Sequence, residues 1–223
     1  MQDQRANLVE RIDAEIEKYS LLKHPFYRMW SEGRLTIDHL QGYSKEYFQL
    51  VKTVPRLVEN ISSLAPASYA KSAAISDNLK EESEHIEPWA RFASAIGVQA
   101  SELANYVGDD ATNSAVSDLI DTSRSSFEEG VAAMYAYEAE LPRISATKIE
   151  GLKNFYGIDS ADATNYFEIH KEADIRHAQV WRSILLSVPA EKQGRSFAAA
   201  VRSLKAQNRL LDSVQQKYVK MNC

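Results

Sequence analysis

The sequence predicts an all-α protein folded as one domain, and three observations lead to this expectation. The 223 residues include only eight glycines and six prolines, the residues that interrupt helices most strongly. Apolar side chains recur three and four residues apart over long stretches, which is the period of an amphipathic helix. No stretch alternates apolar and polar residues like a strand, and no repeat or linker divides the chain. We therefore expect a single domain over residues 1–223, with about seven or eight helices.

The helices of the first half are expected in three places. Residues 5–19 carry apolar side chains at helical spacing, and the aromatic segment 24–30 forms a short helix or turn that Gly33 closes. Thr36 is placed as the N-cap of a long helix that runs to about Leu64. Pro55 should bend that helix.

The second half continues in the same way. A helix is expected over 67–96, ending at Gly97, and a weakly patterned connection leads to a long helix over 112–141. Pro142 should end or kink it, and a shorter helix over 145–156 stops at Gly157. Ser160 or Asp162 begins the next helix, and the last one covers 190–218.

Charge and cysteine content exclude several classes of function. The net charge of −5 and the absence of a dense Lys/Arg cluster argue against a nucleic-acid partner. The first residues, 1–6, contain no apolar signal core, and no apolar run approaches the roughly 20 residues of a membrane span. We expect a cytoplasmic protein. The one cysteine, Cys223, is the last residue, so neither an internal disulfide nor a buried thiol nucleophile is expected.

The strongest chemical signal is the spacing of His170, Asp174 and His177. At about 100° per residue, these positions fan over roughly 60° of one helix. Two imidazoles and a carboxylate on one stripe make half of a typical non-haem metal site. The chain has five histidines in all, so this concentration indicates a function.

Two further segments offer ligands to complete such a site. Glu82 and His85 have the i, i+3 spacing with which carboxylate-bridged bundles direct two side chains at one metal, although Glu81 competes at i, i+4. Glu138 lies in an apolar and aromatic run, where an unpaired charge is costly to bury. It is expected to be a bridging carboxylate.

The six residues together point to two metal ions. Three carboxylates and three imidazoles suit iron or manganese. Each element alone has an ordinary explanation, because Glu-x2-His arises by chance on solvated helices and a buried carboxylate can be satisfied by protein groups. Their coincidence favours the metal site, whereas His24 and His39 are expected to be packing or surface residues. The predicted ligands are Glu82, His85, Glu138, His170, Asp174 and His177.

At these residues the chain resembles the haem-oxygenase-like α-helical superfamily of TenA, PqqC and the CADD-like proteins, and the CADD-like group most closely. The resemblance covers most of residues 5–185 and is weak beyond them. Its motifs are His24-x-Phe26-Tyr27-x2-Trp30-Ser31-x-Gly33-x-Leu35-Thr36, Asp77-Asn78-Leu79, Gly130-Val131-Ala132-Ala133, Tyr137-Glu138, Pro142-Arg143-Ile144 and Glu172-Ala173-Asp174-x-Arg176-His177-Ala178.

The resemblance implies a haem-oxygenase-like bundle and an unusual oxidase. Such an enzyme uses two metals, O2 and an external reductant to make 4-aminobenzoate, the folate precursor, from its own polypeptide in a single turnover. Tyr27 falls at the position of the sacrificed tyrosine, Tyr43 at that of a second active-site tyrosine, and Lys148 at that of the proposed amino donor. Without the resemblance, Tyr27 would be assigned to packing and Lys148 to the solvated surface.

One departure from the family pattern concerns the second-helix ligands. The stretch that separates the carboxylate from its histidine is about four residues shorter here, close to one helical turn. The following His85-x3-Trp89 still matches. Alignment from Asn78-Leu79 selects Glu82 as the carboxylate, while Glu81 remains within geometric reach.

Other functions remain as alternatives. One is a dimetal oxygenase or oxidase that acts on an external small molecule, by N-oxygenation or desaturation. A PqqC-like cofactorless oxidase would not need six aligned ligands, and a TenA-like thiamin hydrolase would need a cysteine nucleophile. In a helical adaptor without activity, these acidic and histidine side chains would be ordinary exposed residues. The sequence is compatible with a homodimer, as in related proteins, and with a monomer.

Overall fold

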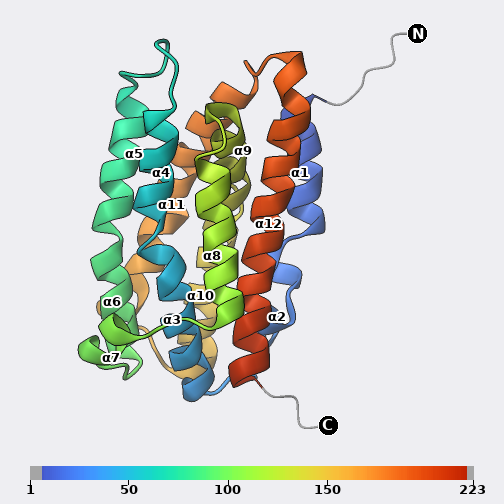
Figure 1. The fold of residues 1–223 in the computed structure, drawn as a ribbon. Coiled ribbons are helices and arrows are strands. Elements are labelled where there is room, and N and C mark those ends of the chain that lie inside the picture. The colour runs from blue at the N-terminus through green and yellow to red at the C-terminus, as the bar shows by residue number, and fades with distance from the viewer. Residues whose placement is uncertain (1–6, 220–223) are drawn as a thin grey trace.

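The computed structural model describes residues 7–219, and these residues form an elongated bundle of helices without a strand. Helices lie side by side along its length (Figure 1). In chain order the elements are α1 (Leu8–Lys18), η1 (Leu21–Lys23), α2 (Pro25–Ser31), α3 (Ile37–Val51), α4 (Val54–Ser63), α5 (Ala73–Glu84), α6 (Ile86–Ala95), α7 (Ala100–Asn105), α8 (Asp110–Ser123), α9 (Phe127–Glu138), α10 (Leu141–Tyr156), α11 (Ala161–Leu185) and α12 (Ala190–Tyr218).

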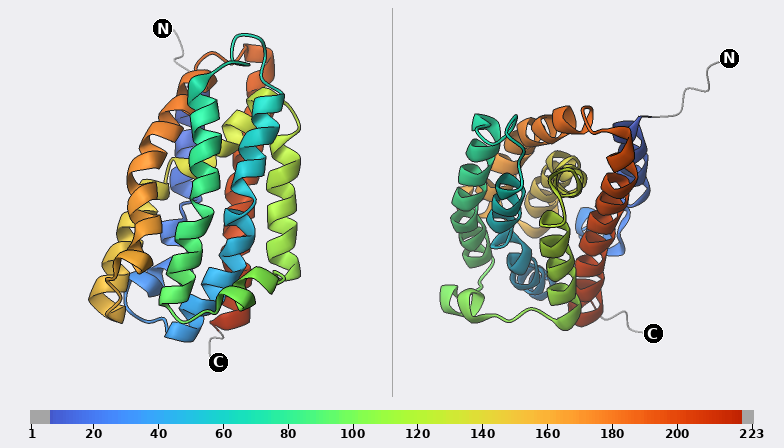
Figure 2. Two further views of the ribbon diagram at one scale, coloured as in Figure 1. Left: turned by 90° about the vertical axis from the view of Figure 1, so that its left-hand side faces the viewer. Right: turned by 45° about the horizontal axis from the view of Figure 1, so that its top comes forward.

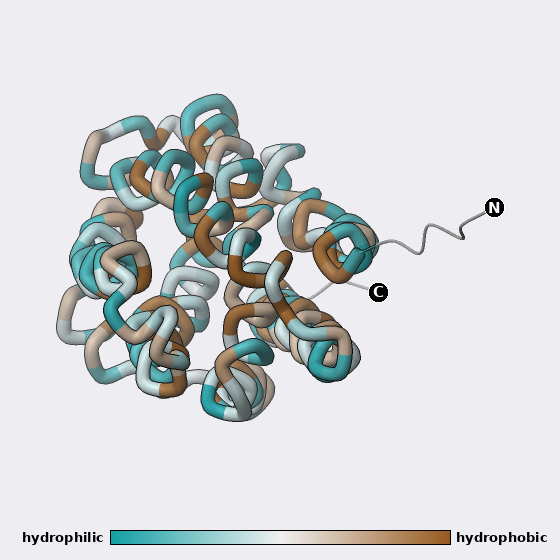
Figure 3. The backbone as a smooth tube through the Cα atoms, turned by 90° about the horizontal axis from the view of Figure 1, so that it is seen from above, coloured by the Kyte–Doolittle hydropathy of each residue, from teal (hydrophilic) through white to brown (hydrophobic). Residues whose placement is uncertain are grey.

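Helix α9 occupies the centre of the bundle. Ten of its residues are buried, including its last residue, Glu138. It packs against α4, α8, α11 and α12, which surround it when the molecule is tilted toward the viewer (Figure 2). Seen from above, hydrophilic segments lie mostly along the outer edges of the helices (Figure 3). Because α9 is central and buried, the carboxylate of Glu138 at its C-terminal end lies in the core.

The expected helix ends agree with the structure where a capping residue sets them. The Thr36 hydroxyl accepts a hydrogen bond from the His39 backbone N–H at 3.3 Å, and the His39 ring accepts one from the Thr36 backbone N–H. Ser160, not Asp162, caps α11. Gly97 and Gly157 follow α6 and α10 with φ of +94° and +65°, a conformation that favours glycine.

Three of the expected long helices are divided into two segments. The helix over 36–64 breaks between α3 and α4, where Pro55 occupies the first turn of α4 and its missing N–H needs no partner. The helix over 67–96 starts only at Ala73 and breaks at His85. The helix over 112–141 breaks before Ser126, whose hydroxyl caps α9.

Two smaller differences concern segments near these breaks. Pro142 lies in the first turn of α10, which therefore begins at Leu141 instead of Ser145. The weakly patterned connection contains the short helix α7. Three expectations concern residues outside the described range. They are the start of the first helix at residues 5 and 6, the lack of an apolar signal core in residues 1–6, and the statements about Cys223. Within 7–219, none of the helices combines the length and apolar character that crossing a membrane requires.

Candidate metal centre

The six predicted ligands converge in the core from three parts of the chain. Two come from the end of α5 and the break that follows it, one from the end of α9, and three from the inward stripe of α11. Each is at most 5% exposed. We call these six residues the metal centre: Glu82, His85, Glu138, His170, Asp174 and His177.

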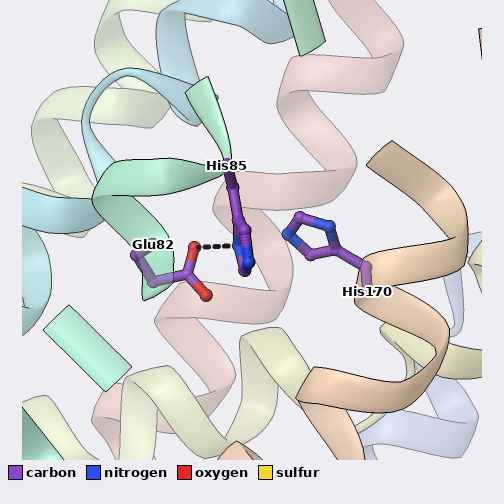
Figure 4. A group of neighbouring side chains, drawn as sticks. All are labelled: Glu82, His85 and His170. Carbon is purple, nitrogen blue, oxygen red and sulfur yellow. Dashed lines mark ion pairs between the residues drawn. The ribbon is translucent and has the colours of Figure 1, made fainter. Parts of the chain in front are cut away.

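Glu82, His85 and His170 form one group within the metal centre. Figure 4 shows their side chains turned toward one another from α5 and α11. His85 Nδ1 lies 3.5 Å from Glu82 Oε2, and the two imidazole rings have centroids 4.4 Å apart. The Nδ1–H of His170 donates to the backbone carbonyl of Tyr166 at 2.8 Å. That bond fixes the tautomer and leaves Nε2 of His170 free to bind a metal.

Glu82 also belongs to a second group, with Glu138, Asp174 and His177. One ligand atom from each of these four residues lies within 4.8 Å of the others. His177 Nδ1 is 3.4 Å from Glu82 Oε1 and 3.5 Å from Asp174 Oδ1. The carboxylate common to both groups is therefore Glu82, whereas Glu138 was expected to bridge. Glu138 belongs only to the second group, and one of its oxygens accepts the Trp181 indole N–H at 2.6 Å.

Buried polar atoms without a hydrogen-bond partner gather at the metal centre. Among the described residues they include one ring nitrogen each of His85 and His177, Glu138 Oε1 and both carboxylate oxygens of Asp174. Buried polar atoms are normally paired, and each unpaired one costs about 1–3 kcal/mol. Oxygen and imidazole donors in this mixture suit iron or manganese. The residues of the two groups therefore could hold metal ions, and Glu82 is the residue that belongs to both groups.

Burial and mutual charge set the protonation of the metal centre. Burial, together with the carboxylate of Asp174, raises the pKa of Glu138 well above its usual range. Burial alone would lower the pKa of His177, but the carboxylates of Asp174 and Glu82 raise it to about 11. Burial also works against ionisation of Glu82, yet the neighbouring imidazoles of His177 and His85 hold its pKa well below the usual range. A metal ion must therefore displace protons when it binds.

Glu81, the alternative to Glu82, lies just outside this cluster. Its side chain is 34% exposed and accepts hydrogen bonds from Arg176 and from His177 Nε2, both at 2.9 Å. Because Nε2 of His177 donates to Glu81, Nδ1 is the atom left for a metal. A carboxylate that orients a metal-binding imidazole in this way is a common arrangement. The geometry thus distinguishes the two glutamates, with Glu82 inside the cluster and Glu81 holding the ring of His177.

The residues aligned with the family's tyrosines and lysine form a second buried group. The hydroxyls of Tyr27 on α2 and Tyr43 on α3 lie 3.0 Å apart, and Lys148 Nζ on α10 donates to the Tyr43 hydroxyl at 2.5 Å. Tyr27 is 2% exposed, and its ring packs against Phe26 and Trp30 as well as Tyr43. We call Tyr27, Tyr43 and Lys148 the tyrosine–lysine row.

Lys148 is buried among aromatic rings instead of lying on the surface. It is 4% exposed, and Nζ lies 4.8–5.2 Å from the ring centroids of Tyr27, Tyr43, Tyr47 and Phe167. Among the described residues no salt bridge reaches it. Burial lowers the pKa of Lys148 well below its usual range. A lysine amine whose pKa is lowered in this way can act as a nucleophile.

The family follows from comparison with known proteins. The family model of the TENA/THI-4/PQQC family matches residues 11–217, which is nearly all of the described chain and includes the C-terminal part where the sequence resemblance was weak. The chain belongs to the TENA/THI-4/PQQC family.

Relatives within and around the TENA/THI-4/PQQC family agree with this assignment. A 4-aminobenzoate synthase of Chlamydia muridarum is 30% identical, over 97% of this chain and 94% of that protein. A 4-aminobenzoate synthase of Chlamydia trachomatis is 34% identical, over 80% and 79%. A domain with a heme oxygenase-like fold from Shewanella denitrificans superposes with a TM-score of 0.73 at 17% identity, over 95% and 90%. The predicted haem-oxygenase-like fold is confirmed.

Some residues of this family member have structural roles that the sequence did not reveal. His24 was expected to be a packing or surface residue, but its Nδ1 accepts the Phe26 N–H at 3.2 Å and so caps α2, the helix of Tyr27. Its Nε2 lies 3.1 Å from Asp212 on α12. The N-cap position before Pro25 was the available signal. The partnership of Trp181 with Glu138 had no signal, because it joins two helices distant in sequence.

Proposed function

We propose that this protein is an O2-dependent dimetal oxidase that makes 4-aminobenzoate from its own Tyr27 in a single turnover. Two kinds of support meet here. Relatives that match most of the chain are named 4-aminobenzoate synthase, and the buried amine of Lys148 shares a hydrogen-bonded row with Tyr27 and Tyr43. The row is the observation that carries the proposal, because it brings the required ring and nitrogen together.

The carbon skeleton of the product supports Tyr27 as its source. The ring and Cβ of a tyrosine contain all the carbon atoms of 4-aminobenzoate, in the same para arrangement. Forming the product requires the Cα–Cβ bond of Tyr27 to break and Cβ to be oxidised to the carboxylate. The nitrogen must replace the phenolic oxygen, which leaves as water, so the Cε–Nζ bond of the donor, Lys148, breaks as well and Cε is left as an aldehyde. Cα of residue 27 takes a hydrogen in place of Cβ, and O2 takes up the electrons that these oxidations remove. Because both side chains are consumed, each chain reacts once.

The metal centre provides the oxidising part of the proposal. Its six residues would hold two ions of iron or manganese, which supply O2 activation when electrons arrive from an external reductant. The unpaired ligand atoms and the low exposure of every ligand support this role. They also argue against a PqqC-like reaction without a cofactor, because such a reaction has no use for carboxylates and imidazoles left unpaired in the core.

The tyrosine–lysine row has its own chemical tasks. Packing of Tyr27 against Phe26, Trp30 and Tyr43 fixes the orientation of its ring, which is the main requirement for an intramolecular reaction. The Tyr43 hydroxyl lies between the phenol and the amine, so it can pass a proton from one to the other. Burial keeps Lys148 unprotonated by lowering its pKa, which preserves its lone pair.

The test uses the complete chain and adds no organic substrate. The purified protein is analysed for iron and manganese, then given reductant and O2, and 4-aminobenzoate is measured by mass spectrometry. Protein labelled with ring-13C tyrosine and side-chain 15N lysine should yield product that carries both labels, at no more than one per chain. Digestion of the reacted protein with trypsin, followed by mass spectrometry, shows what the protein itself has lost. The peptide of residues 24–28 should be lighter because Tyr27 has lost its side chain. Trypsin should no longer cleave after residue 148, because the lysine amine is gone.

A second function is favoured by one observation. A surface hollow of about 350 Å³ between α5 and α11 reaches His85 of the metal centre, and Glu81, Glu172 and Arg176 help to line it. An external small molecule could approach the metals there. Two bound metals without any product from the protein itself would favour this oxygenase or oxidase. Absence of metal together with absence of product would contradict both functions.

A further inference from the structure

Asn78 on α5 is a buried amide that the metal centre and the tyrosine–lysine row do not explain. Its side chain is 1% exposed, and neither Oδ1 nor Nδ2 has a hydrogen-bond partner among the described residues. Leaving both atoms of a buried amide unpaired is unfavourable by about 1–3 kcal/mol for each. Such a group in the core indicates a partner that binds with the metals.

The position of Asn78 points to the metal centre. The buried residues of α5 are Ile75, Asn78 and Glu82, and they form one stripe that ends at His85. Side chains at i and i+4 are neighbours about 5–6 Å apart at Cβ, so Asn78 and Glu82 lie side by side. Asn78 also lines a hollow of about 190 Å³ together with Glu81 and His177. Asn78 therefore lies on the buried face of α5 that also carries Glu82 into the metal centre.

The chemistry of the unpaired amide identifies the partner. Nδ2 needs an acceptor and Oδ1 needs a donor. The neighbouring carboxylates, once they bind metal, are acceptors only. A water molecule is both donor and acceptor, so a water that enters together with a metal ion would meet both needs. A neutral amide also adds no further negative charge to three carboxylates.

We propose that Asn78 is a further positioning residue of the metal centre and that its amide hydrogen-bonds a water molecule beside the metal held by Glu82, Glu138, Asp174 and His177. This inference rests on the proposed metal site. Water completes the coordination of such ions wherever protein ligands are too few. An outer hydrogen-bonding partner of this kind typically changes metal affinity by 10-fold to 100-fold.

The experiment titrates the metal-free full-length protein with Mn(II), following free Mn(II) by electron paramagnetic resonance. Asn78→Leu keeps the number and branching of the side-chain heavy atoms and removes both polar atoms, whereas Asn78→Ala leaves a cavity. The two variants should move the melting temperature of the metal-free protein in opposite directions, upward for leucine and downward for alanine. Both should nevertheless weaken Mn(II) binding about 10-fold or more. Ile75→Val, on the same stripe, is the control and should leave affinity unchanged.

The affinities decide the outcome. Wild-type protein that binds two Mn(II) ions and variants that bind them at least about 10-fold more weakly would support the inference. Variants that retain the wild-type affinity would overturn it and leave the proposed function intact, whatever their melting temperatures. Wild-type protein without Mn(II) binding would overturn both the inference and the metal site. Equal weakening by Ile75→Val would assign the effect to packing of α5 and would also overturn the inference.

Discussion

The metal centre and the tyrosine–lysine row are both buried, yet they treat ionisable groups in opposite ways. In the metal centre, carboxylates and imidazoles face one another, so that the neighbouring imidazoles hold the pKa of Glu82 low and neighbouring carboxylates raise that of His177 to about 11. In the row, Lys148 is surrounded by aromatic rings, and burial alone lowers its pKa. The first region keeps Glu82 and His177 charged, and a bound cation could take the place of the imidazole proton. The second region keeps an amine neutral. The comparison shows that burial in one core stabilises either state, depending on whether opposite charges lie nearby.

The largest expected effect is on the metal centre. His177→Ala removes the imidazole that lies between Glu82 and Asp174, so the variant should lose metal from the second group and form no product. Metal analysis after purification, together with mass spectrometry of the reaction, measures both. His39→Ala, which changes a histidine at the start of α3, should bind metal normally. Two metals retained in His177→Ala would contradict the assigned ligand set.

A substitution in the tyrosine–lysine row should abolish product formation without changing metal binding. Tyr27→Phe removes the phenolic oxygen whose replacement the reaction requires, so product should be abolished while metal content stays at the wild-type level. Tyr69→Phe, a tyrosine that stacks on Phe127 elsewhere in the bundle, is the matched control and should give normal yield. Wild-type yield from Tyr27→Phe would exclude Tyr27 as the source of the ring.

The substitution Lys148→Met tests, through the pH dependence of protein stability, whether the buried amine of the tyrosine–lysine row is neutral. The pKa of Lys148 in the folded protein lies below its ordinary value of 10.5, so between these two values the unfolded chain binds a proton that the folded chain lacks. Wild-type stability therefore rises with pH across that window. Each pKa unit corresponds to about 1.4 kcal/mol, so the variant should be more stable at pH 7 by at least ~1 kcal/mol.

Urea unfolding of metal-free protein at pH 6 to 9 measures this difference. The advantage of Lys148→Met should shrink as pH approaches 10.5, the ordinary pKa of lysine. The variant should also form no labelled product, because its side chain contains no nitrogen. An identical pH slope in variant and wild type would show that Lys148 is not buried as a neutral amine.

A smaller effect is expected from the residue that holds His177. Glu81→Gln keeps an acceptor for His177 Nε2 but removes the charge that pairs with Arg176, so Mn(II) affinity should fall about 10-fold while some binding remains. Glu84→Gln, an exposed neighbour paired with Lys80, should bind Mn(II) like wild type. Complete loss of metal in Glu81→Gln would instead identify Glu81 as a ligand.

The smallest effect should come from the cap of α2. His24→Ala removes the acceptor for the Phe26 N–H, which should lower the free energy of unfolding by about 1 kcal/mol. His24→Asn supplies a good N-cap side chain and should recover most of that loss. Chemical unfolding measures both variants, and metal content should not change. Equal stability of His24→Ala and wild type would show that the cap contributes nothing.

Local patterns in the sequence were sufficient for most of the fold and for the helix face that carries three of the candidate ligands. Few breakers and helical periodicity predicted an all-α bundle, and Thr36 and Ser160 marked helix starts because capping depends on residues a few positions apart. The spacing of His170, Asp174 and His177 placed them on one stripe of α11, which the helix repeat alone determines. The breaks at His85 and before Ser126 were missed, because packing in the bundle outweighed the helical pattern there.

The sequence by itself determined which side chains share a helix face, since that depends only on the helical repeat. Only the tertiary structure placed Glu82 in both groups and Glu81 beside His177 Nε2, and enclosed Lys148 in aromatic rings. These choices depend on contacts between helices far apart in the chain. Burial and the charges of those distant neighbours, which no local spacing encodes, set the protonation of each group.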